Sequence, residues 1–366
     1  MRIKNIMIIF GTRPEAIKMA PIIKELENHS DKIRTIITLS AQHREMLDQV
    51  LEIFDIRADY DLNVMTDNQK LSDITCNVIQ RFEKILEKET VDFLLVQGDT
   101  TTTFAASLIG FYHKIPVGHV EAGLRTNNMY YPFPEELNRV LTTRLASVHF
   151  APTQLAKENL LREGIGEQSI VITGNTVIDA LFYITQKEEY DNTKISDGKK
   201  KILVTAHRRE NFGIGLENIC KAILNIVERH HDVEIDFPVH LNPNVQATVR
   251  NYLSGHDRIK LIEPLDYRHF CKYIAESFLI LTDSGGIQEE APSLGKPVLV
   301  LRNETERQEA IDAGTARLVG VNTQDIVEAT ELLLTNPDHY QLMAKAVNPY
   351  GDGKAGKRIV EYILNS

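Results

Sequence analysis

The chain has 366 residues, of which 43% are apolar and 25% charged, a composition typical of a globular protein that folds unaided. Lys and Arg total 41 against 51 Asp and Glu, so the formal net charge is −10 and a general attraction to nucleic acid or anionic lipid is excluded. No stretch approaches ~18 consecutive apolar residues, so no membrane span is predicted. Three distant cysteines, Cys76, Cys220 and Cys271, form neither a disulfide framework nor a metal-binding spacing. We therefore expect a cytoplasmic protein without a metal.

The first half of the chain alternates short Ile- and Val-rich runs with longer helical segments, as in a parallel sheet covered by helices. Leu71, Ile74, Val78, Phe82 and Ile85 recur at helical spacing and predict a helix with one buried face. The predicted strands of this half are 6–10, 34–39, 93–97, 116–120, 148–151 and 170–172.

A polar segment without apolar periodicity, 188–200, predicts a boundary between two domains. A second alternating series follows it, so we expect two doubly wound halves instead of one large sheet. In such sheets, ligands bind beyond the carboxyl ends of the strands. The predicted strands of the second half are 202–205, 234–239, 259–262, 278–282 and 297–301.

A loop with a turn-forming glycine follows the first predicted strand. Gly11 permits a tight turn, Thr12 can cap the next helix and Pro14 suits its first turn. Arg13 and Lys18 add positive charge near a helix end that already favours anions. The segment matches neither the GxGxxG nor the Walker pattern, so a plain capped helix with exposed basic residues is the alternative interpretation.

A stronger phosphate signal follows the fourth strand of the second half, where Ser284, Gly285 and Gly286 open a helix. Two glycines let a diphosphate approach the backbone, and the serine hydroxyl and the helix N–H groups can donate to it. Glu290, one turn into the helix, suits a ribose diol, and Arg307 can point back at the same site. The alternative is that acidic residues favour the first helical turn and the glycines ease packing.

Four candidates for acid/base chemistry lie at or after predicted strand ends: Asp99, Glu121, Glu135 and His207. Each has an ordinary structural alternative. Asp99 can cap the helix that follows, Glu135 can pair with Arg139 one turn later, and His207 can be a loop histidine. Their common location favours general acid/base work on a sugar.

Six separated motifs stand in a fixed order along nearly the whole chain. They are FGTRPEAIK at 10–18, QGDT at 97–100, HVEAGLRT at 119–126, PEELNR at 134–139, HRREN at 207–211 and TDSGGIQEEAP at 282–292. Together they closely resemble the non-hydrolysing UDP-N-acetylglucosamine 2-epimerases. The resemblance implies an α/β fold of two Rossmann-like domains in a GT-B-type arrangement, with the active site in the cleft between them. It implies an N-terminal domain at 1–185, on which a helix at about 354–366 packs back, and a nucleotide-binding domain at 186–353.

The resemblance also implies roles for individual residues. Asp99, Glu121, Glu135 and His207 match the family's catalytic group. Phe270 is placed beside the uracil, and Leu265 departs from the family, because bacterial relatives often carry Gln there. The full set of implied substrate-binding residues is Arg13, Lys18, Arg139, Phe270, Ser284, Gly285, Gly286, Glu290 and Arg307.

Bacterial members of the family have a second, regulatory substrate site. Gln42, Arg209 and His240 match that site. Glu45 and Asn68 depart from it, because a bacterial relative carries Gln and Arg at these positions. The departures concern regulation and not catalysis.

The expected reaction is reversible C2 epimerisation of UDP-N-acetylglucosamine (UDP-GlcNAc) to UDP-N-acetylmannosamine (UDP-ManNAc), through elimination of UDP and its re-addition to a 2-acetamidoglucal. One of Asp99, Glu121 and Glu135 would abstract the C2 proton, and His207 would assist at the diphosphate or act as an acid. No oxidised intermediate is needed, so no NAD or other cofactor is expected. The family also implies a homodimer that serves surface polysaccharide synthesis. The rivals are a glycosyltransferase of the same fold, a hydrolysing epimerase and a non-catalytic sugar-nucleotide sensor.

Overall fold

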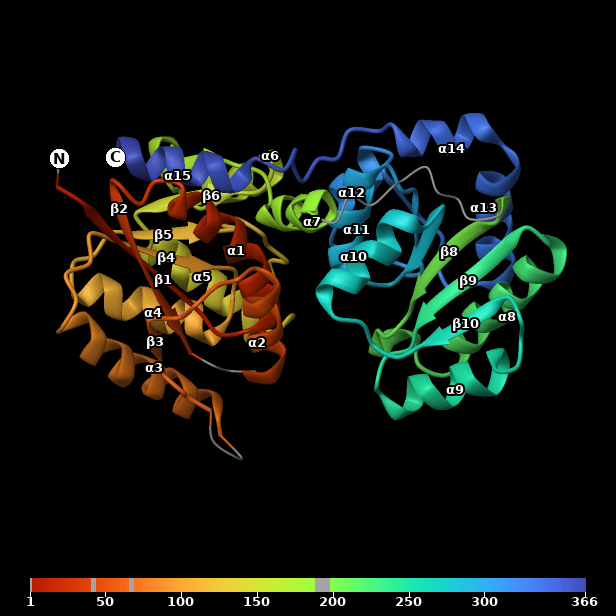
Figure 1. Cartoon of the computed structure of the whole chain (residues 1–366), viewed down its shortest axis with the longest axis horizontal. Helices are drawn as coiled ribbons and strands as arrows, with labels where there is room; N and C mark the ends of the chain where they lie inside the picture. The colour runs from red at the N-terminus through yellow and green to blue at the C-terminus, as the bar shows by residue number, and fades with distance from the viewer. Residues whose placement is uncertain (1, 41–43, 66–68, 188–197) are drawn as a thin grey trace. The chain divides into compact units, whose positions relative to one another are not determined.

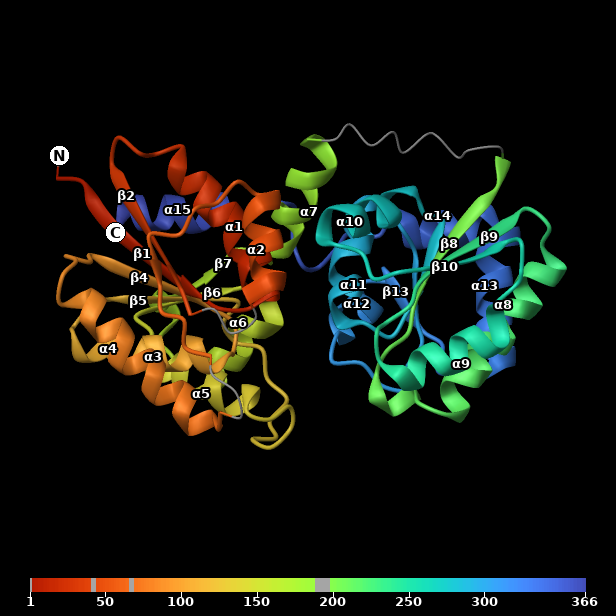
Figure 2. The same cartoon turned by 60° about the horizontal axis from the view of Figure 1, so that its bottom comes forward.

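The computed structural model describes residues 2–40, 44–65, 69–187 and 198–366. The chain forms two compact units: a first unit of Met1–Ala180 with Tyr350–Ser366, and a second unit of Leu181–Pro349. Each unit contains one parallel sheet with helices packed on both of its faces (Figure 1, Figure 2). The predicted α/β class with two Rossmann-like domains is therefore confirmed.

Among the described residues, the first unit has a seven-stranded sheet in the order β3-β2-β1-β4-β5-β6-β7. Its strands are β1 (Lys4–Phe10), β2 (Ile33–Leu39), β3 (Tyr60–Asp61), β4 (Phe93–Gln97), β5 (Val117–Val120), β6 (Val148–Ala151) and β7 (Ile170–Ile172). The helices before the second sheet are α1 (Arg13–Glu27), α2 (Arg44–Ile53), α3 (Leu71–Leu86), α4 (Thr101–Tyr112), α5 (Glu135–Leu145), α6 (Gln154–Arg162) and α7 (Thr176–Lys187), and α15 (Ala355–Asn365) closes the chain. The helix predicted from the spacing of Leu71 to Ile85 is confirmed as α3.

The second unit has a six-stranded sheet in the order β10-β9-β8-β11-β12-β13 within the described part of the chain. Its strands are β8 (Lys200–Thr205), β9 (Val233–Pro238), β10 (Ile259–Ile262), β11 (Leu279–Thr282), β12 (Val298–Val300) and β13 (Ala316–Leu318). Its helices are α8 (Ile214–Arg229), α9 (Pro243–Leu253), α10 (Tyr267–Glu276), α11 (Gly285–Glu290), α12 (Gln308–Asp312), α13 (Thr323–Thr335) and α14 (Pro337–Ala344), with short 3-10 turns at η3 (Arg209–Asn211) and η4 (Ala291–Leu294).

All the predicted strands are present, but two short strands, β3 and β13, were not predicted. They stand at sheet edges and are two and three residues long. Such pieces are too short to show the apolar run by which a buried parallel strand is identified. By contrast, residues 6–10 of β1 are completely buried at the centre of their sheet.

Both sheets reverse their strand order at one point, which is where doubly wound proteins bind ligands. In the first unit the reversal lies between β1 and β4, and in the second unit between β8 and β11. The loops and helix starts that follow these four strands carry predicted site residues of both units, among them Arg13, Asp99, His207 and Ser284.

The C-terminal helix α15 packs on α1 of the first unit. A Cβ placed on Gly356 would lie 3.3 Å from the backbone of Pro21, so the two helices approach closely where the glycine stands. The Gly356 N–H donates to Asp179 at 2.8 Å, and the Lys4 ammonium donates to the carbonyl of Ile363 at 3.0 Å. The last helix is thereby fixed to the domain that begins the chain.

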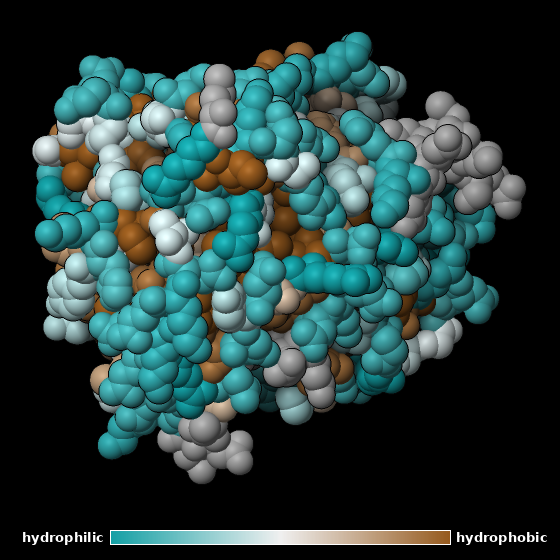
Figure 3. Space-filling model, turned by 60° about the vertical axis from the view of Figure 1, so that its left-hand side comes forward, coloured by the Kyte–Doolittle hydropathy of each residue, from teal (hydrophilic) through white to brown (hydrophobic). Residues whose placement is uncertain are grey.

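The surface mixes polar and apolar side chains. On the face drawn in Figure 3, brown apolar side chains reach the surface among teal polar ones. Phe111 and Tyr112, at the end of α4, are 56% and 64% exposed. Within the described ranges, no helix combines the length and the apolar character needed to cross a bilayer.

Candidate active site

A buried carboxylate ties the loop after β1 to the start of α4. Glu15 accepts the backbone N–H groups of Gly11 (3.0 Å) and Thr12 (2.7 Å) on one oxygen, and the hydroxyls of Thr100 (2.7 Å) and Thr103 (3.2 Å) on the other. Burial raises the pKa of Glu15, although the hydrogen bonds from Thr100 and the Gly11–Thr12 loop oppose the rise. This role of Glu15 was not predicted, although the spacing from Thr12 to Glu15 is that of a capping box and signals it.

Glu121 follows β5 and pairs with a lysine from α1. The Nζ of Lys18 lies 2.6 Å from each carboxylate oxygen, and Gln97 at the end of β4 also donates to Glu121. The backbone of Glu121 is left-handed, with φ of 65°, an uncommon conformation for a residue with a side chain. Lys18 was predicted as a nucleotide ligand, and the structure brings its charge against Glu121.

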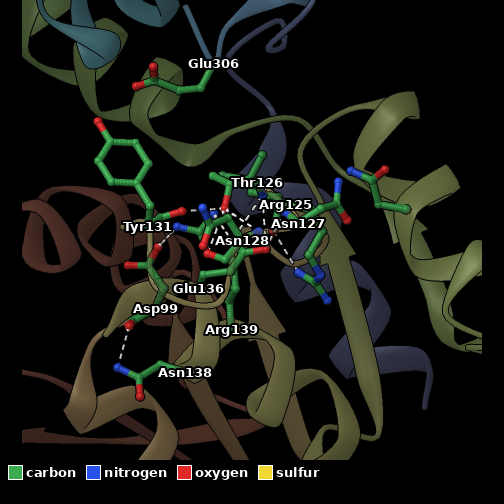
Figure 4. Close-up of polar contacts among 12 residues, drawn as sticks. Asp99, Arg125, Thr126, Asn127, Asn128, Tyr131, Glu136, Asn138, Arg139 and Glu306 are labelled. Carbon is green, nitrogen blue, oxygen red and sulfur yellow. Dashed lines mark hydrogen bonds and ion pairs between the residues drawn. The ribbon is translucent and has the colours of Figure 1, made fainter. Parts of the chain in front are cut away.

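Asp99 follows β4 and is held from α5. The Arg139 guanidinium donates to the Asp99 carboxylate, and the Asn138 amide donates to the Asp99 carbonyl at 3.0 Å (Figure 4). Burial raises the pKa of Asp99, Arg139 opposes the rise and the negative charge of Glu121 adds to it. The alternative that Asp99 caps α4 is wrong, because Thr100 is the N-cap. The Asp99 carboxylate is therefore paired with Arg139 and not with the start of the helix.

Glu135 is the first residue of α5, so it begins a helix and does not lie at a strand end. Its Oε2 is buried and has no hydrogen-bond partner among the described residues. The alternative pairing of Glu135 with Arg139 is not what the structure shows, because the Arg139 guanidinium contacts Asp99 and, at 3.3 Å, Glu136. An unpartnered buried carboxylate oxygen is costly, and such groups concentrate at functional sites.

Glu136, the next residue, organises the loop that precedes α5. It is 1% exposed and accepts the N–H groups of Thr126 (3.1 Å) and Asn127 (3.0 Å). The Thr126 hydroxyl in turn donates to the carbonyl of Tyr131 at 2.6 Å (Figure 4). The sequence does not distinguish the roles of the two adjacent glutamates, because only the fold shows which of them faces the loop.

The second unit has a comparable tie at its own point of strand reversal. Asp283, which follows β11, is completely buried, and one of its oxygens accepts the N–H groups of His207 and Arg208, both at 2.8 Å. The same oxygen accepts the Asn211 amide at 3.0 Å. The loop after β8 is therefore anchored to the end of β11.

His207 lies against a second histidine and a buried carboxylate. Its ring stacks on that of His240, with centroids 5.3 Å apart, and its Nδ1 lies 3.4 Å from Asp283. Burial lowers the pKa of His207, the negative charge of Asp283 opposes this, and His240 and Arg208 reinforce it. The lowered pKa favours the neutral ring, which can accept a proton.

The predicted regulatory residues are only partly described. His240 lies against His207, while Arg209 is exposed in η3. Gln42 and Asn68 fall outside the described residues, as does the side chain of Glu45. The regulatory role of Gln42, Arg209 and His240 stays a prediction.

The predicted phosphate loop has two arginines beside it. A Cβ placed on Gly285, the first residue of α11, would lie 3.2 Å from the carboxylate of Glu306 and 3.8 Å from the guanidinium groups of Arg208 and Arg307. Arg307 is aligned by Glu289, which accepts from its Nε at 2.5 Å. Arg208 was not predicted as a ligand, although it stands within the HRREN motif.

The remaining predicted binding residues are spread over three helices and the residue that precedes one of them. Ser284 precedes α11, and its N–H donates to the Thr282 hydroxyl at 2.9 Å. Glu290 at the end of α11 is buried and accepts the Tyr267 hydroxyl at 3.2 Å. Burial raises the pKa of Tyr267 well above its usual range, so the phenol stays a donor. Three further members of the predicted set are half-buried: Gly286, Phe270 on α10 and Arg13 at the start of α1.

These features define a protein of two Rossmann-like domains, with ion-paired carboxylates after strands of the first sheet and an arginine-flanked glycine loop after a strand of the second. Residues 24–364 match the model of the family described as UDP-N-acetylglucosamine 2-epimerase. The chain is 52% identical to the UDP-N-acetylglucosamine 2-epimerase of Bacillus subtilis, over 100% of this chain and 96% of the relative. It therefore belongs to the UDP-N-acetylglucosamine 2-epimerase family and is an enzyme of that class.

Solved structures agree with this assignment. The crystal structure of the UDP-GlcNAc 2-epimerase from Neisseria meningitidis bound to UDP-GlcNAc has a TM-score of 0.89 and 52% identity, covering 99% of this chain and 100% of that one. The enzyme from Methanocaldococcus jannaschii in complex with UDP-GlcNAc and UDP has a TM-score of 0.79 and 37% identity, covering 99% and 100%. The predicted family is confirmed.

Proposed function

We propose that the chain interconverts UDP-GlcNAc and UDP-ManNAc by eliminating UDP and adding it back to a 2-acetamidoglucal. The ligands of the Neisseria and Methanocaldococcus relatives support a nucleotide-sugar substrate. The observation that carries the proposal is the pair of carboxylates at neighbouring strand ends, Asp99 after β4 and Glu121 after β5, each held by a cation from another element. Such an arrangement fixes proton acceptors in place.

The order of bond changes follows from the acidity of the sugar. The C2 hydrogen is not alpha to a carbonyl, so the C1–O bond breaks first and its electron pair leaves with the UDP oxygen. Arg208 and Arg307, beside Gly285, stabilise the charge that develops on the diphosphate. The cationic sugar then loses its C2 proton to a carboxylate, and a C1–C2 double bond forms.

The return steps restore the substrate's atoms. A second group protonates C2 from the opposite face, and the UDP oxygen re-adds at C1, so UDP-ManNAc contains the same atoms as UDP-GlcNAc. No electrons are gained or lost, and the route needs no redox cofactor. We assign the proton transfers to the group Asp99, Glu121, Glu135 and His207. Glu135 contributes a buried carboxylate oxygen without a hydrogen-bond partner in the described part of the chain, and His207 an imidazole whose lowered pKa favours the neutral form.

The deciding experiment is to incubate the protein with UDP-GlcNAc alone in deuterated water and to follow C2 by NMR. We expect UDP-ManNAc with deuterium at C2, because the proton removed from one face exchanges before the other face is protonated. Free N-acetylmannosamine with UDP would instead indicate a hydrolysing epimerase. A UDP-linked manno product that retains the original hydrogen would contradict the proposal.

We further propose that the enzyme is a homodimer that acts in the cytoplasm and supplies surface polysaccharide synthesis. The exposed Phe111 and Tyr112 at the end of α4 are the apolar side chains that such an interface would cover. Light scattering on the purified chain tests this: we expect twice the mass of the 366-residue chain. A single-chain mass across the working concentration range would contradict it.

A further inference from the structure

A carboxylate lies over the glycine of the predicted phosphate loop. The Oε1 of Glu306 is 3.2 Å from the position that a Cβ on Gly285 would take. The same oxygen is 3.7 Å from Arg208 and 3.9 Å from Arg307. Glu306 therefore stands between the two guanidinium groups that flank the loop.

The other oxygen of Glu306 is held by a buried arginine. Arg302, 7% exposed, donates from Nη1 to Oε2 of Glu306 at 2.6 Å and from Nε to Glu210 at 2.6 Å. Partial burial opposes ionisation of Glu306, but the backbone and the charges of Arg307 and Arg302 outweigh it, so its pKa is lowered. The side chain is thus a charged group held in one direction, with 37% of its surface still exposed.

The charges around this loop balance among the residues that we have named. Arg208, Arg302 and Arg307 face the three carboxylates of Glu210, Glu289 and Glu306. A phosphate that accepts a hydrogen bond from the Gly285 backbone must bring its oxygen within about 3 Å of that N–H. The Glu306 carboxylate lies beside Gly285 and the same two arginines, and a phosphate brought to them would be repelled by its negative charge.

We propose that Glu306 competes with the diphosphate for Arg208 and Arg307, so that it turns away from Gly285 when a nucleotide diphosphate binds and limits the affinity for it. The proposal rests on the proposed function, because the phosphate is that of the sugar nucleotide. Glu306 is a residue that tunes ligand affinity, and it takes no part in proton transfer.

The test measures UDP and uridine binding to the full chain by calorimetry. In Glu306→Gln the amide keeps the shape and an acceptor for Arg302 but loses the charge. We expect UDP to bind about five- to tenfold more tightly, as befits one partly exposed charge about 4 Å from the ligand's arginines. Uridine, which has no phosphate, should bind as it does to the wild type. Glu304→Gln, an exposed neighbour in the same loop, controls for net charge and should leave UDP affinity unchanged.

The alternative role for Glu306 is to hold the arginines in place. In that case Glu306→Gln should weaken UDP binding instead of tightening it. If Glu306→Gln binds UDP equally or more weakly, the inference is overturned while the proposed function stands. If uridine binding tightens as much as UDP binding, the effect is structural and the inference is also overturned. Failure of the wild type to bind UDP would instead overturn the proposed function. If the glutamine variant does not fold, Glu306→Ala replaces it, and UDP should again bind more tightly than to the wild type.

Discussion

In each unit a buried carboxylate joins the loop after the first strand to the loop after the fourth, but the carboxylate comes from a different loop in the two units. Each must join the loop after its first strand to the loop after its fourth, because the ligand site lies where the strand order reverses. In the first unit the carboxylate belongs to the first loop: Glu15 accepts hydroxyls from Thr100 and Thr103. In the second unit it belongs to the fourth: Asp283 accepts backbone N–H groups from His207 and Arg208.

The difference shows how each site positions its reactive groups. In the first unit the tie passes beside Asp99, whose side chain is then oriented by an ion pair with Arg139. In the second unit the tie holds the backbone of His207 itself, and the imidazole is placed by the loop that carries it. Substitution of one partner of an ion pair changes the orientation of one side chain. Loss of a carboxylate that holds the backbone displaces the whole loop. The two units should therefore respond differently to the loss of one carboxylate.

The largest expected effect is that of Asp99→Asn in the first unit. Loss of a proton acceptor should lower turnover by about 10²- to 10⁴-fold while UDP affinity stays nearly unchanged, because the tie through Glu15 is left intact. Turnover is measured by NMR and affinity by calorimetry. Asp31→Asn, exposed before β2, is the matched control and should behave as the wild type. A collapse of UDP affinity together with turnover would make Asp99 a ligand or a structural residue.

Asp283→Asn should act on stability in the second unit. One oxygen of Asp283 accepts three N–H donors, and hydrogen bonds to a charged group are the strong ones, so we expect the free energy of unfolding to fall by about 2 kcal/mol. The pKa of His207 should also fall further, because the negative charge of Asp283 raises it in the wild type. Urea unfolding and an NMR titration of the histidine measure the two effects.

Asp257→Asn, in an exposed turn before β10, is the control for that experiment. It should leave both the unfolding free energy and the His207 pKa unchanged. A rise in the His207 pKa in Asp283→Asn would show that the carboxylate does not stabilise the imidazolium. Asp283 would then act on His207 only through the backbone hydrogen bond.

The smallest effect belongs to Glu15→Gln, which should cost less than about 1 kcal/mol in urea unfolding. A glutamine oxygen can accept from Gly11 and Thr12, and its amide can donate to the threonine hydroxyls. The pKa of Glu15 is raised in the folded state, so stability linked to this carboxyl is present below its unfolded value of 4.5 and is lost as the pH rises through the folded pKa. Glutamine does not titrate. The free energy of unfolding of the variant should therefore rise relative to that of the wild type as the pH is raised from acid to neutral.

Glu52→Gln, exposed on α2, is the control and should show no such pH dependence relative to the wild type. If Glu15→Gln instead loses more stability at neutral pH than in acid, the ionised carboxylate is what the loop requires. The two ties would then be equivalent, and the contrast between the units would disappear.

Much of the site could be located from the sequence, because strand ends and glycine turns are local features. Asp99, Glu121, His207 and the loop at Gly285 all lie at the predicted carboxyl ends. The partners could not be located in this way. Lys18 and Glu121 are 103 residues apart, and nothing in either segment indicates the contact.

The sequence by itself determined the alternation of strands and helices, the family and the positions of the reactive loops, since these depend on apolar periodicity, turn residues and motif order. The tertiary structure alone decided which charges face one another. It placed Glu136 and not Glu135 beside Arg139, and Glu306 over Gly285. The physical reason is that an ion pair or a buried hydrogen bond acts over a few ångströms in space, and only the packing of the sheet brings distant residues that close.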